Sequence, residues 1–139
     1  MLEDSAQIIW NEQVGIVMEK IRGIRRLIKA FRYSIAGLKA AWENEEAFRL
    51  EIFLSIPIIA AGLWLGENGS QRAILIGVWF IVLITELINS AVESIVDRIG
   101  PEENILSGRA KDLGSAAVLV SICTGIIVWG IIAWGRFLD

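Results

Sequence analysis

The stretch 113-LGSAAVLVSICTGIIVWGIIAWG-135 decides the fold. It runs for 23 positions without a charged residue. At about 1.5 Å of rise per residue, a helix of that length crosses the roughly 30 Å hydrocarbon core of a bilayer. Buried helices of soluble proteins are rarely so long and so free of charge. The stretch therefore predicts a membrane-spanning helix and, with it, an all-α membrane protein.

Two further spans are predicted upstream. One opens with 73-AILIGVWFIVLIT-85, which carries no charge, and then turns amphipathic. The other contains a single uncharged run, 52-IFLSIPIIAAGLWLG-66, which is short for a crossing, so its helix should begin near Glu45. The predicted spans thus cover about 45–66, 72–98 and 108–136.

The start of the third span contains small residues at helical spacing. Ser107 suits the N-cap position of its helix. Ala110 and Gly114, four residues apart, form a small-xxx-small pair, which lets a neighbouring helix approach closely. We expect close helix packing at this point.

Residues 22–43 are helical in period but too charged to span a membrane. Apolar residues recur there at three- and four-residue steps, with arginine and lysine between them. The pattern is typical of an amphipathic helix in the membrane interface, its basic face toward anionic headgroups. A helix packed against protein is the alternative. Residues 1–20 are an extension of undecided role, and residues 21–139 form the predicted membrane-embedded domain.

Basic residues near the span ends predict the orientation. Segment 20–39 carries seven lysines and arginines, connection 67–72 carries one, and connection 97–112 carries three. The tail after the third span carries only Arg136. Because cytoplasmic segments are richer in lysine and arginine, this alternation places the N-terminus in the cytoplasm and the C-terminus on the outer side of the membrane.

The second span ends in a polar stripe, within 81-IVLITELINSAVESIVDRIG-100. At about 100° per residue, Glu86, Asn89, Glu93 and Asp97 share an arc of roughly 80° and extend for about 16 Å along the helix. An acidic side chain facing lipid at a helix centre costs about 2.5–3.5 kcal/mol. Such residues face protein or water instead, and they are functional by default. The stripe is therefore a candidate site.

The stripe contains the parts of a phosphoryl-transfer site. Carboxylate and amide oxygens suit Mg²⁺, which takes few protein ligands together with phosphate oxygens. A carboxylate in an apolar setting suits general-base work, and Lys111 and the basic segment 20–39 could hold phosphate charge. The chain has no histidine and no Walker loop, which excludes histidine chemistry and a P-loop nucleotide site. A proton or cation pathway, or a structural subunit whose acids pair with partner arginines, remains open at this point.

Three segments resemble the prokaryotic diacylglycerol kinase family. They are 33-YSIAGLKAAWENEEAFRLE-51, 86-ELINSAVESIVDRIG-100 and 107-SGRAKDLGSAAV-118, and the likeness covers roughly residues 25–137. The resemblance implies a small integral kinase of the bacterial inner membrane, with a periplasmic C-terminus. It further implies a homotrimeric helical bundle that binds no nucleic acid. The kinase would transfer the γ-phosphoryl of MgATP to the primary hydroxyl of diacylglycerol, giving phosphatidic acid.

The resemblance also implies roles for individual residues. Glu86 would be the general base, Glu45 and Glu93 would hold the metal, and Asn89 would belong to the same site. Asp97, which comes from the stripe itself, is either a further site residue or ends the helix against Arg98. The implied nucleotide-binding residues are Arg26, Tyr33, Glu45, Glu93, Glu102, Lys111 and Asp112. The implied lipid-substrate residues are Ala30, Tyr33, Ser34, Trp42, Ala47, Phe48, Arg49, Glu51, Trp64, Arg72, Glu86, Ser115, Trp129 and Trp134.

One position bears on the acceptor lipid. Diacylglycerol-using members typically read F-R-Q-E where this chain has 48-FRLE-51, so Leu50 stands at a position that is polar in them. A sister branch phosphorylates undecaprenol and tends to begin its third span with K-D-x-A-A-G. Here 111-KDLGSAAV-118 resembles the diacylglycerol pattern. The expected acceptor is diacylglycerol, with undecaprenol as the alternative.

Overall fold

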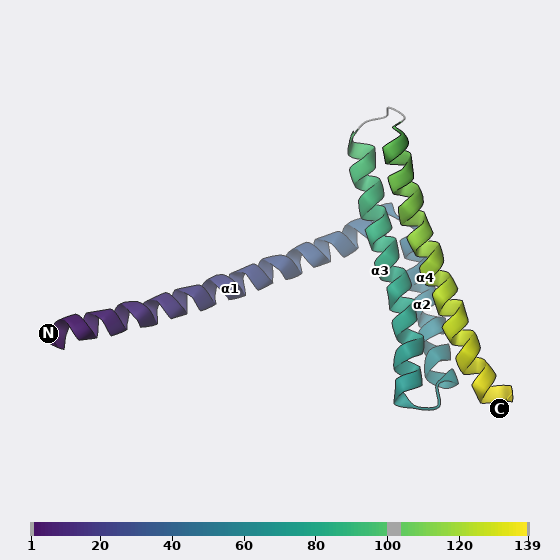
Figure 1. Cartoon of the computed structure of the whole chain (residues 1–139), viewed down its shortest axis with the longest axis horizontal. Helices are drawn as coiled ribbons and strands as arrows, with labels where there is room; N and C mark the ends of the chain where they lie inside the picture. Colours follow the sequence, from purple (N-terminus) through teal and green to yellow (C-terminus); the bar gives the residue numbers. More distant parts are fainter. Residues whose placement is uncertain (1, 100–103, 139) are drawn as a thin grey trace. The chain divides into compact units, whose positions relative to one another are not determined.

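The computed structural model describes the backbone of residues 2–99 and 104–138, and the side chains of residues 23–99 and 104–138. Within these ranges the regular structure consists of four α-helices (Figure 1). Their bounds are α1 Leu2–Asn44, α2 Glu46–Leu65, α3 Gly69–Ile99 and α4 Ile105–Leu138. In this described part, α2, α3 and α4 are long and apolar enough to cross a membrane. The all-α membrane fold is confirmed.

Helix α1 is longer than the sequence predicts. It begins at Leu2 rather than near residue 22, and residues 1–40 form a compact unit of their own. No proline interrupts the segment, and an interior glycine costs a helix only about 1 kcal/mol, so nothing in the chain forces a break before Asn44. From residue 23 on, its exposed large apolar residues keep the expected three- and four-residue spacing: Ile24, Leu27, Ile28, Phe31, Ile35 and Leu38.

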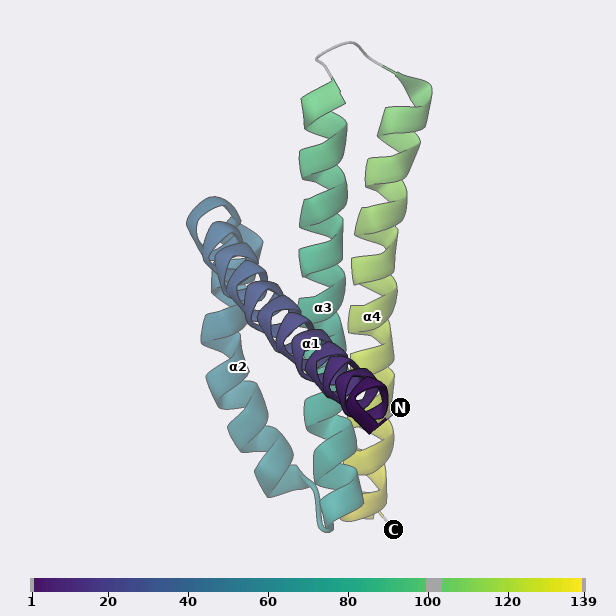
Figure 2. The same cartoon turned by 90° about the vertical axis from the view of Figure 1, so that its left-hand side faces the viewer.

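The three spans pack as antiparallel neighbours (Figure 2). Trp79 of α3 donates its indole N–H to Ser55 Oγ of α2 at 2.7 Å. Between α3 and α4, the hydroxyls of Thr85 and Ser121 lie 2.9 Å apart. These side-chain contacts fix the register of the bundle. They also show that Trp79 packs between helices.

Helix α3 is the central element of the bundle, because its buried face contacts both neighbours. Its buried residues recur at helical spacing: Leu75, Val82, Leu83, Glu86, Asn89 and Ser90. Leu83 packs with Phe48 of α2 and with Ala41, and Ile52, Trp79 and Leu87 surround this cluster. One face of α3 is therefore apolar in its first half and polar in its second.

Helix α4 begins two residues before its predicted cap. The sequence places the N-cap at Ser107, but the helix begins at Ile105. The side chain of Asn104 accepts a hydrogen bond from the Leu106 N–H at 2.8 Å. An asparagine just before a helix satisfies the unpaired N–H groups of its first turn as well as serine does. The expectation for Ser107 is therefore wrong.

Arg136 near the end of α4 holds the C-terminal end of α2. Its guanidinium donates to the backbone carbonyls of Trp64 and, at 2.6 Å, Leu65, and lies 4.7 Å from the centre of the Trp64 ring. The last carbonyls of a helix have no partner within the helix, and an arginine can satisfy them. In the sequence, Arg136 is recognisable only as a positive charge after the third span.

Replacing Arg136 with alanine is expected to lower the free energy of unfolding by about 1–2 kcal/mol, because two carbonyls lose their donor. Thermal unfolding in detergent micelles measures the change. Arg136→Lys should recover only part of it, since an ammonium cannot reproduce both the fork of hydrogen bonds and the stacking on Trp64. Equal unfolding temperatures for all three proteins would contradict this role.

Candidate active site

The polar stripe on α3 changes from buried to exposed along the helix. Glu86 and Asn89 are each only 8% exposed, whereas the side chain of Asp97 is 66% exposed. Asn89 Nδ2 donates to Glu93 Oε1 at 3.0 Å, four residues further on. The helix has 31 residues, so it is about 46 Å long and exceeds a 30 Å membrane core by several turns. Glu86 directly follows the uncharged run 73–85 and so lies at the end of the apolar segment, with Glu93 beyond it.

Helix α2 brings two more carboxylates to the stripe. The Trp79–Ser55 contact sets α2 and α3 in a register that places Glu45 level with Asn89. The negative charges of Glu45 and Glu93 both act on Glu86, and that of Glu86 acts on Glu51. Glu45 occupies the N-cap position of α2, yet its side chain makes no capping hydrogen bond within the described chain. Its carboxylate is thus available for another contact.

Helix α4 contributes a cation and a close approach. Lys111 Nζ forms an ion pair with Asp97 Oδ1 at 2.5 Å. Gly114 lies against the Asn89 side chain so closely that an added Cβ would overlap Oδ1. The close helix approach predicted from Ala110 and Gly114 is confirmed at Gly114. What the sequence did not reveal is that this glycine touches a residue of the acidic stripe.

Two buried oxygen atoms in this region have no hydrogen-bond partner among the described residues. They are Asn89 Oδ1 and Glu51 Oε2. A buried acceptor without a donor costs about 1–3 kcal/mol, and such atoms in native proteins call for an explanation such as a bound ion. An amide oxygen is only an acceptor, so a proton donor or a cation would satisfy it.

The acidic side chains fit a metal site in which the protein supplies only some of the ligands. No three of them converge closely enough to hold a metal ion among the residues that the structure describes. Mg²⁺ is commonly bound through one or two carboxylates, with the remaining positions taken by water and substrate phosphates. Glu93 and Glu45 each lie within electrostatic reach of Glu86. The cluster therefore fits a cation that arrives with phosphate oxygens.

Comparison with known proteins decides the family. Residues 32–133 match the model for prokaryotic diacylglycerol kinase. A diacylglycerol kinase of Escherichia coli (strain K12) is 48% identical over 115 residues, which is 83% of this chain and 94% of that protein. This chain belongs to the prokaryotic diacylglycerol kinase family. Further family members are a diacylglycerol kinase of Haemophilus influenzae, 48% identical (81% of this chain, 96% of that protein), and one of Helicobacter pylori strain 26695, 41% identical (88% and 91%). The chain is accordingly an ATP-using membrane kinase.

Several of the residues that the family resemblance implies for lipid binding lie away from the acidic cluster. Arg72 and Glu86 are fourteen residues apart on α3, about 21 Å along the helix. Trp64 lies near the same end as Arg72, whose Nε donates to the Gly66 carbonyl at 2.9 Å. Trp134, on the last part of α4, is 63% exposed. The structure therefore does not bring these three residues to Glu86.

The other implied residues have different environments. Phe48 is buried in the core, and Arg49 donates to the carbonyls of Trp42 and Glu43 at 3.0 and 3.3 Å. Ala47 is exposed on α2, and Asp112 and Ser115 are exposed on α4. On α1, in the unit of residues 1–40, the exposed implied residues are Arg26, Ala30, Tyr33 and Ser34. Glu102 lies outside the described residues.

Proposed function

We propose that this chain is an integral membrane lipid kinase that transfers the γ-phosphoryl group of MgATP to the primary hydroxyl of diacylglycerol, giving phosphatidic acid and ADP. The observation that carries the proposal is Glu86, a buried carboxylate on the inward face of a membrane-spanning helix, close to where the apolar segment ends. A lipid hydroxyl and a water-soluble nucleotide can meet only at such a depth.

In the proposed reaction Glu86 is the general base. The acceptor hydroxyl oxygen bonds to the γ-phosphorus as the bond from phosphorus to the bridging oxygen breaks. The hydroxyl proton passes to the Glu86 carboxylate, and ADP leaves. A positioned base of this kind contributes typically 10²–10⁴-fold to a rate. Burial shields the Glu86 carboxylate from water.

Glu45 and Glu93 would hold the metal. Mg²⁺, when bound with ATP, neutralises the charge that develops on the transferring phosphoryl group. Glu93 is held in place by the Asn89 amide, and the Glu45 carboxylate is uncommitted at the helix cap. Lys111, paired with Asp97 at the exposed end of the stripe, would face the phosphates, since lysine is a common phosphate ligand. Arg26, Tyr33, Glu102 and Asp112 complete the proposed nucleotide contacts.

Glu93→Gln and Glu45→Gln are each expected to raise the Mg²⁺ concentration for half-maximal activity by at least about tenfold. Glutamine at position 93 keeps the oxygen that accepts from Asn89, so the change removes charge rather than that hydrogen bond. A Mg²⁺ titration of kinase activity measures the shift. Glu67→Gln, an exposed change in the connection between α2 and α3, serves as the control. An unchanged Mg²⁺ requirement in both variants would remove these residues as ligands.

We further propose a homotrimer in the bacterial inner membrane, multi-pass, with a cytoplasmic N-terminus and a periplasmic C-terminus. Asp112 and Ser115 support assembly, because both are exposed within one chain at the start of a membrane-spanning helix. Polar side chains at that depth are normally covered by protein or water. The alternating basic residues support the orientation.

Reconstituted vesicles separate the proposed kinase from an ion-conducting protein. The kinase should consume ATP only when diacylglycerol is present, and should pass no current of protons or cations under a pH gradient. Ion flux without ATP, together with ATP consumption that is independent of lipid, would establish the transport function instead.

A further inference from the structure

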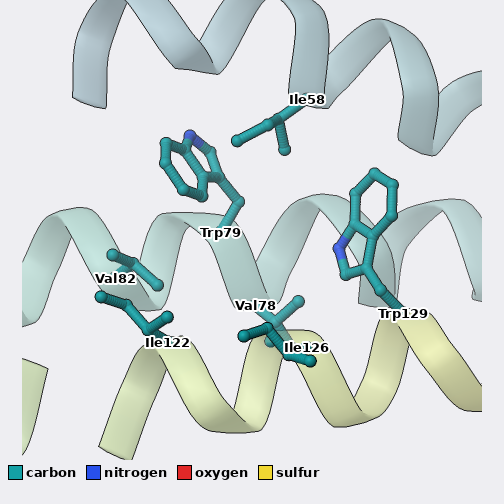
Figure 3. A pocket seen from close by; sticks show the side chains of 8 residues that line it. Ile58, Val78, Trp79, Val82, Ile122, Ile126 and Trp129 are labelled. Carbon is teal, nitrogen blue, oxygen red and sulfur yellow. The ribbon is translucent and has the colours of Figure 1, made fainter. Parts of the chain in front are cut away.

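A carbon-lined cavity of about 340 Å³ lies between α2, α3 and α4, outside the acidic cluster. Figure 3 shows Trp79 of α3 and Trp129 of α4 both reaching toward the side of Ile58 on α2. Val82 and Ile122 line the cavity closer to the α3–α4 contact. The volume lies at the lower end of the roughly 300–1,000 Å³ typical of ligand pockets. It suits one slender apolar group.

The polar atoms around the cavity are already paired. The indole N–H of Trp79 donates to Ser55 Oγ at 2.7 Å, and that of Trp129 donates to the Leu75 carbonyl at 3.2 Å. The faces of both rings are therefore free to contact carbon, while their donors are occupied. Apolar cavities of this kind do not hold water well, because water needs two to four polar partners. The cavity thus favours a hydrocarbon ligand.

The position of the cavity relates it to the proposed catalytic base. Val82 and Glu86 lie one turn apart on the same buried face of α3, about 6 Å along the axis. Trp79 lies about 10 Å from Glu86 in the same direction, toward the middle of the span. A lipid whose hydroxyl reached Glu86 would direct a chain along this face into the cavity.

We propose that the cavity holds an acyl chain of the acceptor lipid, and that Trp79, Ile122 and Gly125 limit the chain length that the enzyme uses well. This inference rests on the proposed lipid kinase function. A chain tied to a glycerol at Glu86 enters the cavity as part of the same molecule, which gives it an advantage over free membrane lipids. The acceptor is therefore the occupant, rather than a bulk phospholipid.

Gly125 gives direct access to the cavity. An added Cβ at this position meets no atom within 4 Å, so a side chain can begin here without a clash, and Gly125→Leu should occupy part of the cavity. Gly130, five residues further along α4, is equally open but does not line the cavity. Gly130→Leu is thus a matched control for adding a bulky side chain to the same span.

The test compares dioctanoylglycerol and dihexadecanoylglycerol as acceptors in detergent micelles. Gly125→Leu should lower kcat/KM for the long-chain acceptor by about tenfold or more relative to the short-chain acceptor. Wild type and Gly130→Leu should have the same ratio of kcat/KM for the long-chain acceptor to kcat/KM for the short-chain acceptor. If Gly125→Leu leaves that ratio unchanged, whether or not total activity falls, the assignment of the cavity to the acceptor chain is overturned.

A second measurement uses the wild-type protein and does not depend on turnover. A diacylglycerol with a diazirine midway along one chain should label residues 122–129 on photolysis. Excess unmodified diacylglycerol should suppress the label, and excess phosphatidylcholine should not. Label elsewhere only, or suppression by both lipids, overturns the proposal. If wild type phosphorylates neither glycerol, the proposed function is wrong, and the labelling still decides whether the cavity binds the chain.

Discussion

Replacing Glu86 with glutamine is expected to reduce ATP-dependent phosphorylation of diacylglycerol by about 10²–10⁴-fold. Glutamine keeps the shape of the side chain but cannot accept the hydroxyl proton. The loss should appear in kcat, with little change in the KM for ATP, because Glu86 is not among the proposed nucleotide contacts. Initial rates with saturating Mg²⁺ and lipid measure the effect.

The fold of the Glu86→Gln protein should be intact. Removing a charge from a buried position that is only 8% exposed, beside other acids, relieves repulsion and should leave the unfolding temperature equal or higher. Glu67→Gln, in the connection before α3, should have wild-type activity. Turnover by Glu86→Gln within about tenfold of wild type would remove Glu86 as the base.

Replacing Gly114 with alanine is expected to lower activity by about 100-fold, because a displacement of about 1 Å in a catalytic group has that effect. The added methyl group would overlap Asn89 Oδ1, so either α4 or the Asn89 side chain must move. Asn89 in turn donates to Glu93, a proposed metal ligand. Overpacking of this kind also destabilises a fold by about 1–3 kcal/mol. Kinase rates and thermal unfolding measure the two effects.

Two further variants assign the cause of the Gly114→Ala defect. Gly130→Ala adds the same methyl group to α4 where it meets no other atom, and it should behave as wild type. Asn89→Ala combined with Gly114→Ala removes the overlapping oxygen, so it should recover stability but not activity. If the double variant remains as unstable as Gly114→Ala alone, the contact between these two residues is not the cause.

The spans could be predicted because membrane crossing depends on local properties of the chain. The uncharged run at 113–135 needs no knowledge of its neighbours to be identified. The ends of the helices were harder to predict. Helix α1 already begins at Leu2, and Asn104 rather than Ser107 provides the capping side chain at the start of α4. Amphipathic period and capping preference each permit several neighbouring end points, and packing selects among them.

The acidic stripe could be predicted because its residues lie on one helix, where 3.6 residues per turn fix their relative positions. The contacts between helices could not be predicted from the sequence. The proximity of Glu45 and Glu51 to Glu86 depends on the α2–α3 register, which the Trp79–Ser55 hydrogen bond records. Likewise, the small residues near Gly114 predicted close packing without revealing Asn89 as the neighbour. No sequence pattern indicated the contacts of Arg136, because its partners are backbone carbonyls of another helix.

We propose that the buried carboxylate of Glu86 serves phosphoryl transfer to a membrane lipid. Transfer of radiolabelled phosphate from ATP, with diacylglycerol and undecaprenol compared as acceptors in parallel, tests it most directly. We predict labelled phosphatidic acid as the main product from the wild-type protein, and none above background from Glu86→Gln. Labelled undecaprenyl phosphate as the main product would contradict the proposed acceptor. The absence of any labelled lipid with both acceptors would contradict the proposed phosphoryl transfer to a membrane lipid.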